Sequence, residues 1–324
     1  MKITFFYRNH KAGYSIKKVS DLYVNQMEDK EIYEMPSPYA SMMSILKNIW
    51  FTFKHRNKTG INHITGDIHY CIIPLMFCKT VLTVHDTVVY DNYKGLKKII
   101  LKYLWFKIPF LLATKIVCIS ENTKDSITRF TKRKDIMVIP NAVEPNYQFV
   151  PYTFNDKLPN ILIIGTNWNK NIERTIDAIS NIKCRLTIIG KLTKEQKEKL
   201  KNTKCSYSNK TNLSDEEIKM EYIHSDIVSF CSLYEGFGMP IIEGNAIGRP
   251  VITSNIAPMP AIANGSALLV DPYNVKDIHD KITLYINNKE LRQKNIGKGI
   301  ENAKKYNCAI IANAYKYLYN SLLS

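Results

Sequence analysis

Short runs of apolar, mostly β-branched residues recur along the chain, and segments with a helical spacing of apolar positions lie between them. The runs are continuous rather than alternating, which is typical of strands buried on both faces of a parallel sheet. The predicted strands are residues 3–7, 81–84, 116–119, 136–139, 161–164, 186–189, 227–230, 251–253 and 268–270. The predicted helices include residues 173–180, 194–201, 214–224, 276–289 and 309–323. Strands and helices in this alternation predict an α/β protein with doubly wound sheets.

The pattern is interrupted at residues 144–159, where three prolines and several turn-forming residues lie between two predicted strands. A chain of 324 residues is long enough for two ordinary domains, and a hydrophobic content of 45% gives each of them a core. We therefore expect two Rossmann-like domains, residues 1–150 and 151–324. The last helix is free to pack back on the first domain.

The charge of the chain narrows the choice of partners. There are 45 lysine and arginine residues against 29 aspartate and glutamate residues, a formal net charge of +16. A charge of this size favours a polyanionic partner, which leaves nucleic acid, anionic lipid and a phosphorylated substrate open.

Cysteine usage and hydropathy indicate the cellular compartment in which the protein is expected to work. The seven cysteines are odd in number and form no CxxC pair, so we expect a reduced, cytoplasmic protein without a cysteine-built metal site. No apolar stretch approaches the roughly 20 residues that a membrane-spanning helix needs. The N-terminus lacks the apolar core and cleavage site of a signal peptide.

The segment 232–271 carries the clearest chemical signal. It follows a predicted strand, passes through a glycine turn at Gly236 and Gly238, and enters a helix that Pro240 is suited to start. The bare backbone and the positive end of the helix dipole form an anion site there. Glu235 and Glu243 are placed so that both face one cleft, and carboxylates are suitable acceptors for sugar and ribose hydroxyls. The alternative is a plain turn followed by a solvated helix face.

This segment, EGFGMPIIEGNAIGRPVITSNIAPMPAI, resembles the donor site of retaining family-4 glycosyltransferases. That family has the GT-B fold, in which two Rossmann-like domains face each other across a cleft. The resemblance extends over most of the chain, in the order HITGDIHY (63–70), TVHD (83–86), VCISENTKDSI (117–127), VIPNAVE (138–144), IIGTNWNKNIERTIDAI (163–179), LTIIGK (186–191) and LSDEEI (213–218). It implies an acceptor-side N-terminal domain and a C-terminal domain that binds a nucleotide sugar.

The resemblance also implies roles for individual residues. Glu243 would bind the ribose hydroxyls of the nucleotide, and Glu235 would hold the hydroxyls of the transferred sugar. Lys170 would neutralise the departing diphosphate, so that no metal ion or other cofactor is needed. The backbone of the glycine turn would contact the diphosphate or the sugar, through Gly236, Phe237, Gly238 and Met239. For Lys170, the alternative is an ordinary solvated lysine.

One departure from the family concerns this basic site. The family often carries an arginine close to the lysine, whereas Thr166 and Asn169 stand near Lys170 here. Lys191 or Arg174 is left to complete the diphosphate clamp.

Two further positions lie in the N-terminal half. His85 ends a predicted strand, and the matching histidine of the family approaches the transferred sugar; the alternative is a hydrogen-bonded structural histidine. Asp86 is expected to be a local cap or an acceptor-side contact. Gly13 matches a loop that approaches the phosphates and the acceptor, although the family often has a glycine pair there.

The segment from Tyr93 to Lys115 contains six lysines and no acidic residue, with Trp105 and Phe106 between them. This composition is typical of a helix at an anionic membrane surface, with both aromatic residues at the headgroup boundary. A core helix with a solvated lysine face is the alternative.

Several signals are absent from the sequence. There is no P-loop, no GxGxxG turn after a strand, and no Asp-x-Asp pair of the kind used by metal-dependent glycosyltransferases. We therefore expect a metal-independent hexosyltransferase that acts with retention on a nucleotide-diphosphate sugar. The expected acceptor is a glycan, lipid-linked and part of bacterial surface polysaccharide synthesis, at the inner face of the cytoplasmic membrane. The alternatives are a basic nucleic-acid-binding protein, which shows none of the usual motifs, and a catalytically inactive glycosyltransferase-like partner.

Overall fold

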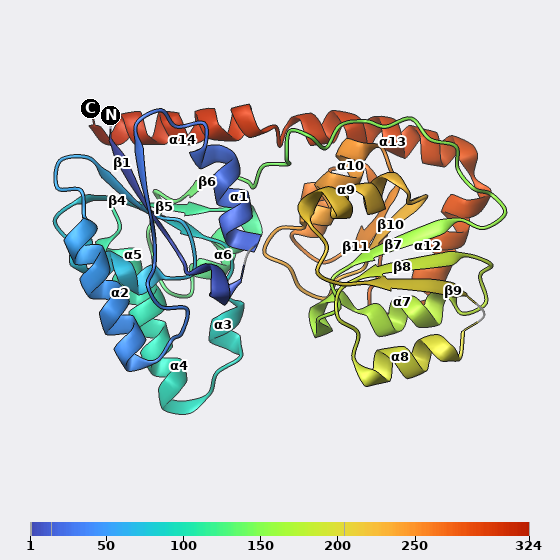
Figure 1. The fold of residues 1–324 in the computed structure, drawn as a ribbon, viewed down its shortest axis with the longest axis horizontal. Coiled ribbons are helices and arrows are strands. Elements are labelled where there is room, and N and C mark those ends of the chain that lie inside the picture. Colours follow the sequence, from blue (N-terminus) through green and yellow to red (C-terminus); the bar gives the residue numbers. More distant parts are fainter. Residues whose placement is uncertain (1, 14, 204, 324) are drawn as a thin grey trace. The chain divides into compact units, whose positions relative to one another are not determined.

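In the computed structural model, which describes residues 2–13, 15–203 and 205–323, the strands form two parallel sheets of six strands each (Figure 1). The chain divides into two compact units. The first unit holds the chain as far as Ala142 and again from Cys308, and the second holds Val143–Asn307. Each unit has helices on both faces of its sheet, so the doubly wound α/β architecture is confirmed.

The sheet of the first unit has the strand order β2-β1-β3-β4-β5-β6. Its strands are β1 (Ile3–Tyr7), β2 (Lys30–Glu34), β3 (Ile61–Ile64), β4 (Lys79–Val84), β5 (Lys115–Cys118) and β6 (Met137–Val138). Its helices are α1 (Ser15–Val24), α2 (Met42–His55), α3 (Val88–Asp91), α4 (Gly95–Leu101), α5 (Ile108–Leu112), α6 (Glu121–Ile127) and α14 (Cys308–Leu323). Short 3-10 helices cover His10–Ala12 (η1) and His69–Leu75 (η2), and a π-helical segment, Lys102–Lys107 (η3), joins α4 to α5.

Successive residues of each strand enter different cores, because side chains alternate across a sheet. In β1, Phe6 packs against the face that carries α2 and η2, whereas Phe5 packs against the face that carries α1 and α14. Both side chains are fully buried. The continuous apolar runs of the sequence therefore reflect a sheet covered on both sides.

The last helix belongs to the first unit, where α14 lies beside α1 (Figure 1). Its Tyr319 hydroxyl lies 2.7 Å from Nδ1 of the buried His63 in β3. The Tyr315 ring stacks on Tyr23 of α1 with ring centroids 4.0 Å apart. Aromatic packing and a buried hydrogen bond thus attach the C-terminal segment to strands that precede it by more than 200 residues.

The second sheet has the strand order β12-β11-β10-β7-β8-β9. Its strands are β7 (Asn160–Ile164), β8 (Arg185–Ile189), β9 (Ser206–Lys210), β10 (Ile227–Phe230), β11 (Val251–Ser254) and β12 (Ala267–Val270). Its helices are η4 (Trp168–Lys170), α7 (Ile172–Ile179), α8 (Lys194–Lys201), α9 (Asp215–Ile223), α10 (Met239–Ile247), α11 (Met259–Ala263), α12 (Val275–Asn287) and α13 (Lys289–Lys304). Among the described helices of the whole chain, none is both long enough and apolar enough to cross a membrane.

The segment between the sheets packs on the second unit, so the division falls after Ala142 rather than near residue 150. Val150 donates its N–H to the carbonyl of Ile247 at the end of α10. The buried Arg249 guanidinium stacks on the Tyr152 ring, with its central carbon 3.8 Å from the ring centroid. The turn-forming residues of this segment do not reveal these contacts, because the contacts are made with the end of α10, about 100 residues further along the chain.

All nine predicted strands are present, and the structure adds β2, β3 and β9. β2 and β9 each form one edge of their sheet and consist largely of polar and charged residues. β3 is buried but contains Asn62 and His63, which interrupt its apolar run. The prediction therefore missed these three strands because they lack a continuous run of apolar residues.

The sequence-based placement of two aromatic side chains was wrong. Trp105 and Phe106 do not point outward from the basic segment, because both belong to the core between the sheet and η2. Phe106 stacks on Phe130 with ring centroids 4.3 Å apart. The exposed large apolar and aromatic side chains of this segment are instead Tyr93, Leu96, Ile99, Ile100, Tyr103, Ile108 and Leu111.

The buried histidines of the first unit predict acid sensitivity. Burial lowers the pKa of His63 to about 3 and that of His69 to about 4, from an ordinary value near 6.5. Between these values the unfolded chain binds protons that the folded unit does not. The free energy of unfolding should therefore fall as the pH falls below about 6.5, by up to about 1.4 kcal/mol per pH unit for each histidine.

Urea unfolding at pH 7.5, 6.5 and 5.5 measures this dependence. A Trp168→Phe background leaves Trp50 and Trp105 as the fluorescent reporters, and both lie in the first unit. His69→Gln should reduce the slope between pH 6.5 and 5.5. An unchanged slope in that variant would contradict the assignment.

Candidate active site

The chain reverses direction across the second sheet between β7 and β10. From β7 the sheet grows through β8 to β9, and from β10 it grows the other way through β11 to β12. At such a reversal the loops that leave the carboxyl ends of the two central strands diverge, and ligands of open α/β sheets bind there. The loop after β7 carries Lys170, and the loop after β10 carries Glu235.

These two side chains form an ion pair, with Nζ of Lys170 2.6 Å from Oε1 of Glu235. The side chains are only 20% and 14% exposed, so the pair is largely shielded from water. The ammonium group also lies 4.9 Å from the centroid of the Phe230 ring at the end of β10. An ammonium has three N–H donors, so the bond to Glu235 leaves others for an anionic ligand.

Gly165 makes room for the lysine. It has a φ of +88°, and a Cβ at this position would lie 2.9 Å from Cε of Lys170 and 3.1 Å from its Cγ. The aliphatic part of Lys170 therefore lies directly over the backbone at the end of β7. A glycine is required for both its conformation and its lack of a side chain.

Asparagines hold the two loops together. Asn169 donates from Nδ2 to the Tyr234 carbonyl at 3.0 Å and accepts the Leu233 N–H on its own carbonyl at 2.7 Å. The buried Asn171 donates to the carbonyls of Cys231 and Pro272. The loop geometry is thus fixed by backbone partners in the loops that follow β10 and β12.

The helix that follows, α10, begins at Met239 after Gly238, which has a φ of +127°. No side chain caps this end, and Pro240 lies in the first turn, where a missing N–H is harmless. Phe237 is buried against the edge of the Tyr306 ring. The N-terminus of α10 thus presents backbone N–H groups beside the Lys170–Glu235 pair.

Glu243 lies one turn into α10 and accepts a 2.5 Å hydrogen bond from the hydroxyl of Tyr222 in α9. Burial is the main cause that raises the pKa of Tyr222, and the Glu243 carboxylate adds to it, so the phenol stays protonated and donates. The Tyr147 ring packs edge-on against Tyr222, and its buried hydroxyl has no hydrogen-bond partner within the described residues. Two phenols and a carboxylate thus form a polar cluster on this side of α10.

The first sheet reverses between β1 and β3. Arg8, directly after β1, donates from Nε to the Gly13 carbonyl at 3.1 Å and from Nη1 to Asp67 at 3.1 Å. Gly13 has a φ of +132°, and a Cβ there would lie 2.6 Å from Nη2 of Arg8. The arginine therefore fixes the glycine loop to the loop after β3.

His85 follows β4 and is half-buried. Its Nε2 lies 2.9 Å from the Thr65 carbonyl, which can only accept, so Nε2 carries the proton and Nδ1 is left as an acceptor. Burial lowers the pKa of His85, which favours this neutral form. Asp86 accepts the N–H of Val88 at 3.0 Å, a local contact at the start of α3, and its role as a cap or an acceptor-side contact stays a prediction.

Two family descriptions together match most of the sequence. Residues 148–304 match the glycosyl transferases group 1, and residues 32–147 match the glycosyltransferase family 4. The chain is a family-4-like glycosyltransferase. An uncharacterized glycosyltransferase of Methanocaldococcus jannaschii is 29% identical over 258 residues, which cover 75% of this chain and 68% of that protein.

Two more proteins show how far the likeness extends. The capsular polysaccharide biosynthesis glycosyltransferase CapM of Staphylococcus aureus is 27% identical over 261 residues, 72% of this chain and 68% of CapM. The crystal structure of Anabaena HepE in complex with UDP and glucose superposes with a TM-score of 0.79 at 12% identity, covering 99% of this chain and 100% of HepE. That structural match establishes the GT-B fold of the glycosyltransferase.

In this glycosyltransferase the predicted donor-site residues occupy one edge of the second sheet. Lys170, Glu235 and the N-terminus of α10 lie together, and Glu243 lies on the same helix. Lys191 is exposed, and its backbone carbonyl accepts a hydrogen bond from the Thr166 hydroxyl at 2.8 Å, which places Lys191 beside the loop after β7. Gly13 and His85 lie in the other unit.

Arg174 does not extend towards the Lys170–Glu235 pair. It donates to Asn171 and lies 5.5 Å from the centroid of the Tyr273 ring. Arg174 is therefore positioned as a partner of the loop after β7. Among the described residues of the glycosyltransferase, no group of three or more His, Cys, Asp or Glu side chains is arranged to hold a metal ion.

Three contributors to the site escaped the sequence analysis. Tyr222 contacts Glu243, Phe230 contacts Lys170, and Arg8 fixes the Gly13 loop. Phe230 is the last residue of a predicted strand, and Arg8 directly follows one. Ligands of α/β sheets bind at the carboxyl ends of the strands, so the sequence did offer a signal for these two residues. Tyr222 lies in a helix, and nothing in its local sequence points to Glu243.

The contact between Gly165 and Lys170 generates a prediction. Gly165→Ala should displace the lysine and lower turnover by about tenfold or more, because the diphosphate would lose a positioned charge. Gly265→Ala is the matched control, since Gly265 has a φ of +76° but no atom within 4 Å of its added Cβ. Turnover is compared by nucleotide release, and stability by thermal unfolding. Equal turnover in the two variants would contradict the role given to Lys170.

Proposed function

We propose that this glycosyltransferase transfers a hexosyl unit, with retention of configuration, from a nucleotide-diphosphate sugar to a growing glycan. The observation that carries the proposal is the shielded Lys170–Glu235 pair beside the N-terminus of α10. It combines a positive charge, backbone donors and a carboxylate in one place. The positive charge and the backbone donors match a diphosphate, and the carboxylate matches the hydroxyls of a sugar.

In the proposed complex the donor lies along the carboxyl edge of the second sheet. Glu243, oriented by Tyr222, accepts the ribose hydroxyls. The backbone from Gly236 to Met239 contacts the diphosphate or the sugar. Lys191 follows the carboxyl end of β8 by two residues, so it lies at the same edge of the sheet and adds a second positive charge. Glu235 holds hydroxyls of the hexose.

The chemistry is a substitution at the anomeric carbon. The bond between that carbon and the diphosphate oxygen breaks, and a bond to the acceptor hydroxyl oxygen forms on the same face. The departing phosphate takes the hydroxyl proton. Lys170 stabilises the charge that develops on the diphosphate, so we propose that the reaction needs no metal ion.

The acceptor is proposed to be a lipid-linked glycan of bacterial surface polysaccharide synthesis. The likeness to CapM, a capsular polysaccharide biosynthesis glycosyltransferase, supports the polysaccharide. The basic first unit, with His85 and the Gly13 loop at its sheet edge, is the proposed acceptor side. The complex of HepE with UDP makes UDP-sugars the first donors to screen.

The two glutamates should behave differently when they are replaced. Glu243→Ala should weaken binding of the free nucleoside diphosphate by about tenfold or more, because a hydrogen-bonded carboxylate is lost. Glu235→Ala should leave that binding nearly unchanged and lower turnover. Calorimetry with UDP and nucleotide release with EDTA present measure the two effects. Wild-type turnover in both variants would contradict the site.

We also propose that the basic segment binds an anionic membrane surface. Lys94, Lys97 and Lys107 are exposed, and they lie among the exposed Leu96, Ile99 and Leu111. Each lysine near the surface contributes about 1 kcal/mol of attraction. Lys115 contributes less, since it pairs with Asp135 at 3.6 Å.

Vesicle binding tests this membrane proposal. The wild type should bind vesicles with anionic lipid, bind neutral vesicles little, and dissociate in high salt because the Debye length shrinks from about 10 Å at 0.1 M to about 3 Å at 1 M. Replacing Lys94, Lys97 and Lys107 by glutamate should abolish binding to the anionic vesicles. The same charge change in α8, at Lys194, Lys197 and Lys201, should have a far smaller effect. Equal losses would show that only net charge matters.

A further inference from the structure

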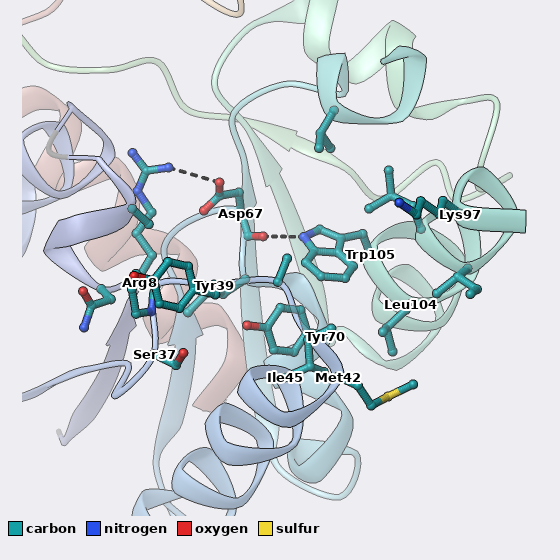
Figure 2. Close-up of a pocket in the computed structure, with 18 of the residues that line it drawn as sticks. Arg8, Ser37, Tyr39, Met42, Ile45, Asp67, Tyr70, Lys97, Leu104 and Trp105 are labelled. Carbon is teal, nitrogen blue, oxygen red and sulfur yellow. Dashed lines mark hydrogen bonds and ion pairs between the residues drawn. The ribbon is translucent and has the colours of Figure 1, made fainter. Parts of the chain in front are cut away.

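A pocket of about 440 Å³ opens in the first unit between α2 and the α4–η3 segment. Figure 2 shows Arg8 and Asp67 on one side of it, Lys97 and Leu104 on the other, and Met42 and Ile45 of α2 along another wall. Its volume lies in the range of small-molecule sites. No role in the proposed donor chemistry uses this pocket.

One end of the pocket is polar and lies at the reversal point of the first sheet. Arg8 and Asn9 follow β1, and Asp67 follows β3. Arg8 and Asp67 are joined by their 3.1 Å ion pair. The pocket therefore begins where the topology of a doubly wound sheet places a ligand.

The inner wall is aromatic and rigid. Trp105 donates its indole N–H to the Asp67 carbonyl at 2.6 Å, and its ring meets Tyr70 edge-on with centroids 4.6 Å apart. The Tyr70 hydroxyl accepts a 2.8 Å bond from the fully buried Asn48 of α2. The wall is thus held by hydrogen bonds that do not involve a ligand.

The outer wall continues onto an exposed apolar surface. Met42 and Ile100 line the pocket, yet they are 70% and 49% exposed. On α2 the exposed side chains continue as a stripe at helical spacing, and a second stripe runs along α4 into η3. The first stripe is Met42, Met43, Leu46, Trp50 and Phe53, and the second is Leu96, Ile99, Ile100 and Tyr103.

Basic groups border these stripes. Nζ of Lys54 lies 3.7 Å from the Trp50 ring centroid, the Arg56 guanidinium lies 3.7 Å from that of Phe53, and Lys97 lies at the pocket rim. An apolar surface edged by cations is complementary to anionic amphiphiles.

We propose that this pocket binds an anionic amphiphile, the lipid part of the acceptor, with its apolar chain on the wall formed by Met42 and Ile100. The anionic head lies near Lys97, and the sugar hydroxyls lie at the Arg8–Asp67 end. The proposal deepens the proposed function, because it rests on a lipid-linked acceptor. Of the α2 stripe, only Met42 lines the pocket, so the rest of the stripe is not part of the proposed contact.

Neighbouring residues provide matched variants. Ile100→Glu and Met42→Glu place a carboxylate in the pocket wall, whereas Ile99→Glu and Met43→Glu place it on the same helices at positions of similar exposure outside the pocket. The probe is decyl phosphate below its micellar concentration, with decanol and inorganic phosphate as separate arms. Affinity is measured by calorimetry, and folding by circular dichroism.

Decyl phosphate should bind the wild type more tightly than decanol or phosphate does. Ile100→Glu and Met42→Glu should weaken it by about tenfold or more, because a carboxylate would be buried against the chain, while the two outer variants should stay within about twofold. Equal losses in all four variants, or binding of phosphate alone, would overturn the pocket assignment.

UDP binding and sugar transfer separate this proposal from the function on which it rests. A wild type that transfers sugar but does not bind decyl phosphate would refute the pocket and leave the transferase function standing. A wild type that binds decyl phosphate but transfers no sugar from any nucleotide sugar would refute the function instead.

Discussion

Parallel pairing of every described strand is the constraint on which the rest of the structure depends. In a parallel sheet all carboxyl ends lie at one edge, so the loops that follow them gather there. In the second unit this edge joins Lys170 after β7 to Glu235 after β10. In the first unit it joins Arg8 after β1 to Asp67 after β3. In the described part of the chain, both units thus carry an ion pair at the point where the strand order reverses.

The two ion pairs have different surroundings, and the proposed functions follow from the difference. The Lys170–Glu235 pair adjoins the uncapped start of α10, whose backbone donors suit phosphate oxygens. The Arg8–Asp67 pair adjoins an apolar pocket that opens between two exposed hydrophobic stripes. A nucleotide sugar matches the first site, and an amphiphilic acceptor matches the second.

Much of the fold and part of the site could be predicted from the sequence. Strands buried on both faces need continuous apolar runs, so those strands were located, whereas the polar edge strands β2 and β9 were not. The sequence motif led to Glu235, Glu243 and Lys170 as candidates, and their roles in binding the donor stay predictions. The motif did not reveal the contact between Lys170 and Glu235, because that contact depends on β7 and β10 being neighbours in the sheet. Trp105 was misplaced because composition does not reveal which face of a helix packs inward.

A double-mutant cycle on Lys170 and Glu235 tests the central claim most directly. The singles Lys170→Met and Glu235→Gln and the double variant are compared with the wild type in sugar transfer from the best nucleotide sugar. If the pair acts as one unit on the donor, both singles lose turnover and the double loses little more than the worse single. Losses that multiply in the double variant, or wild-type turnover in either single variant, would contradict the account.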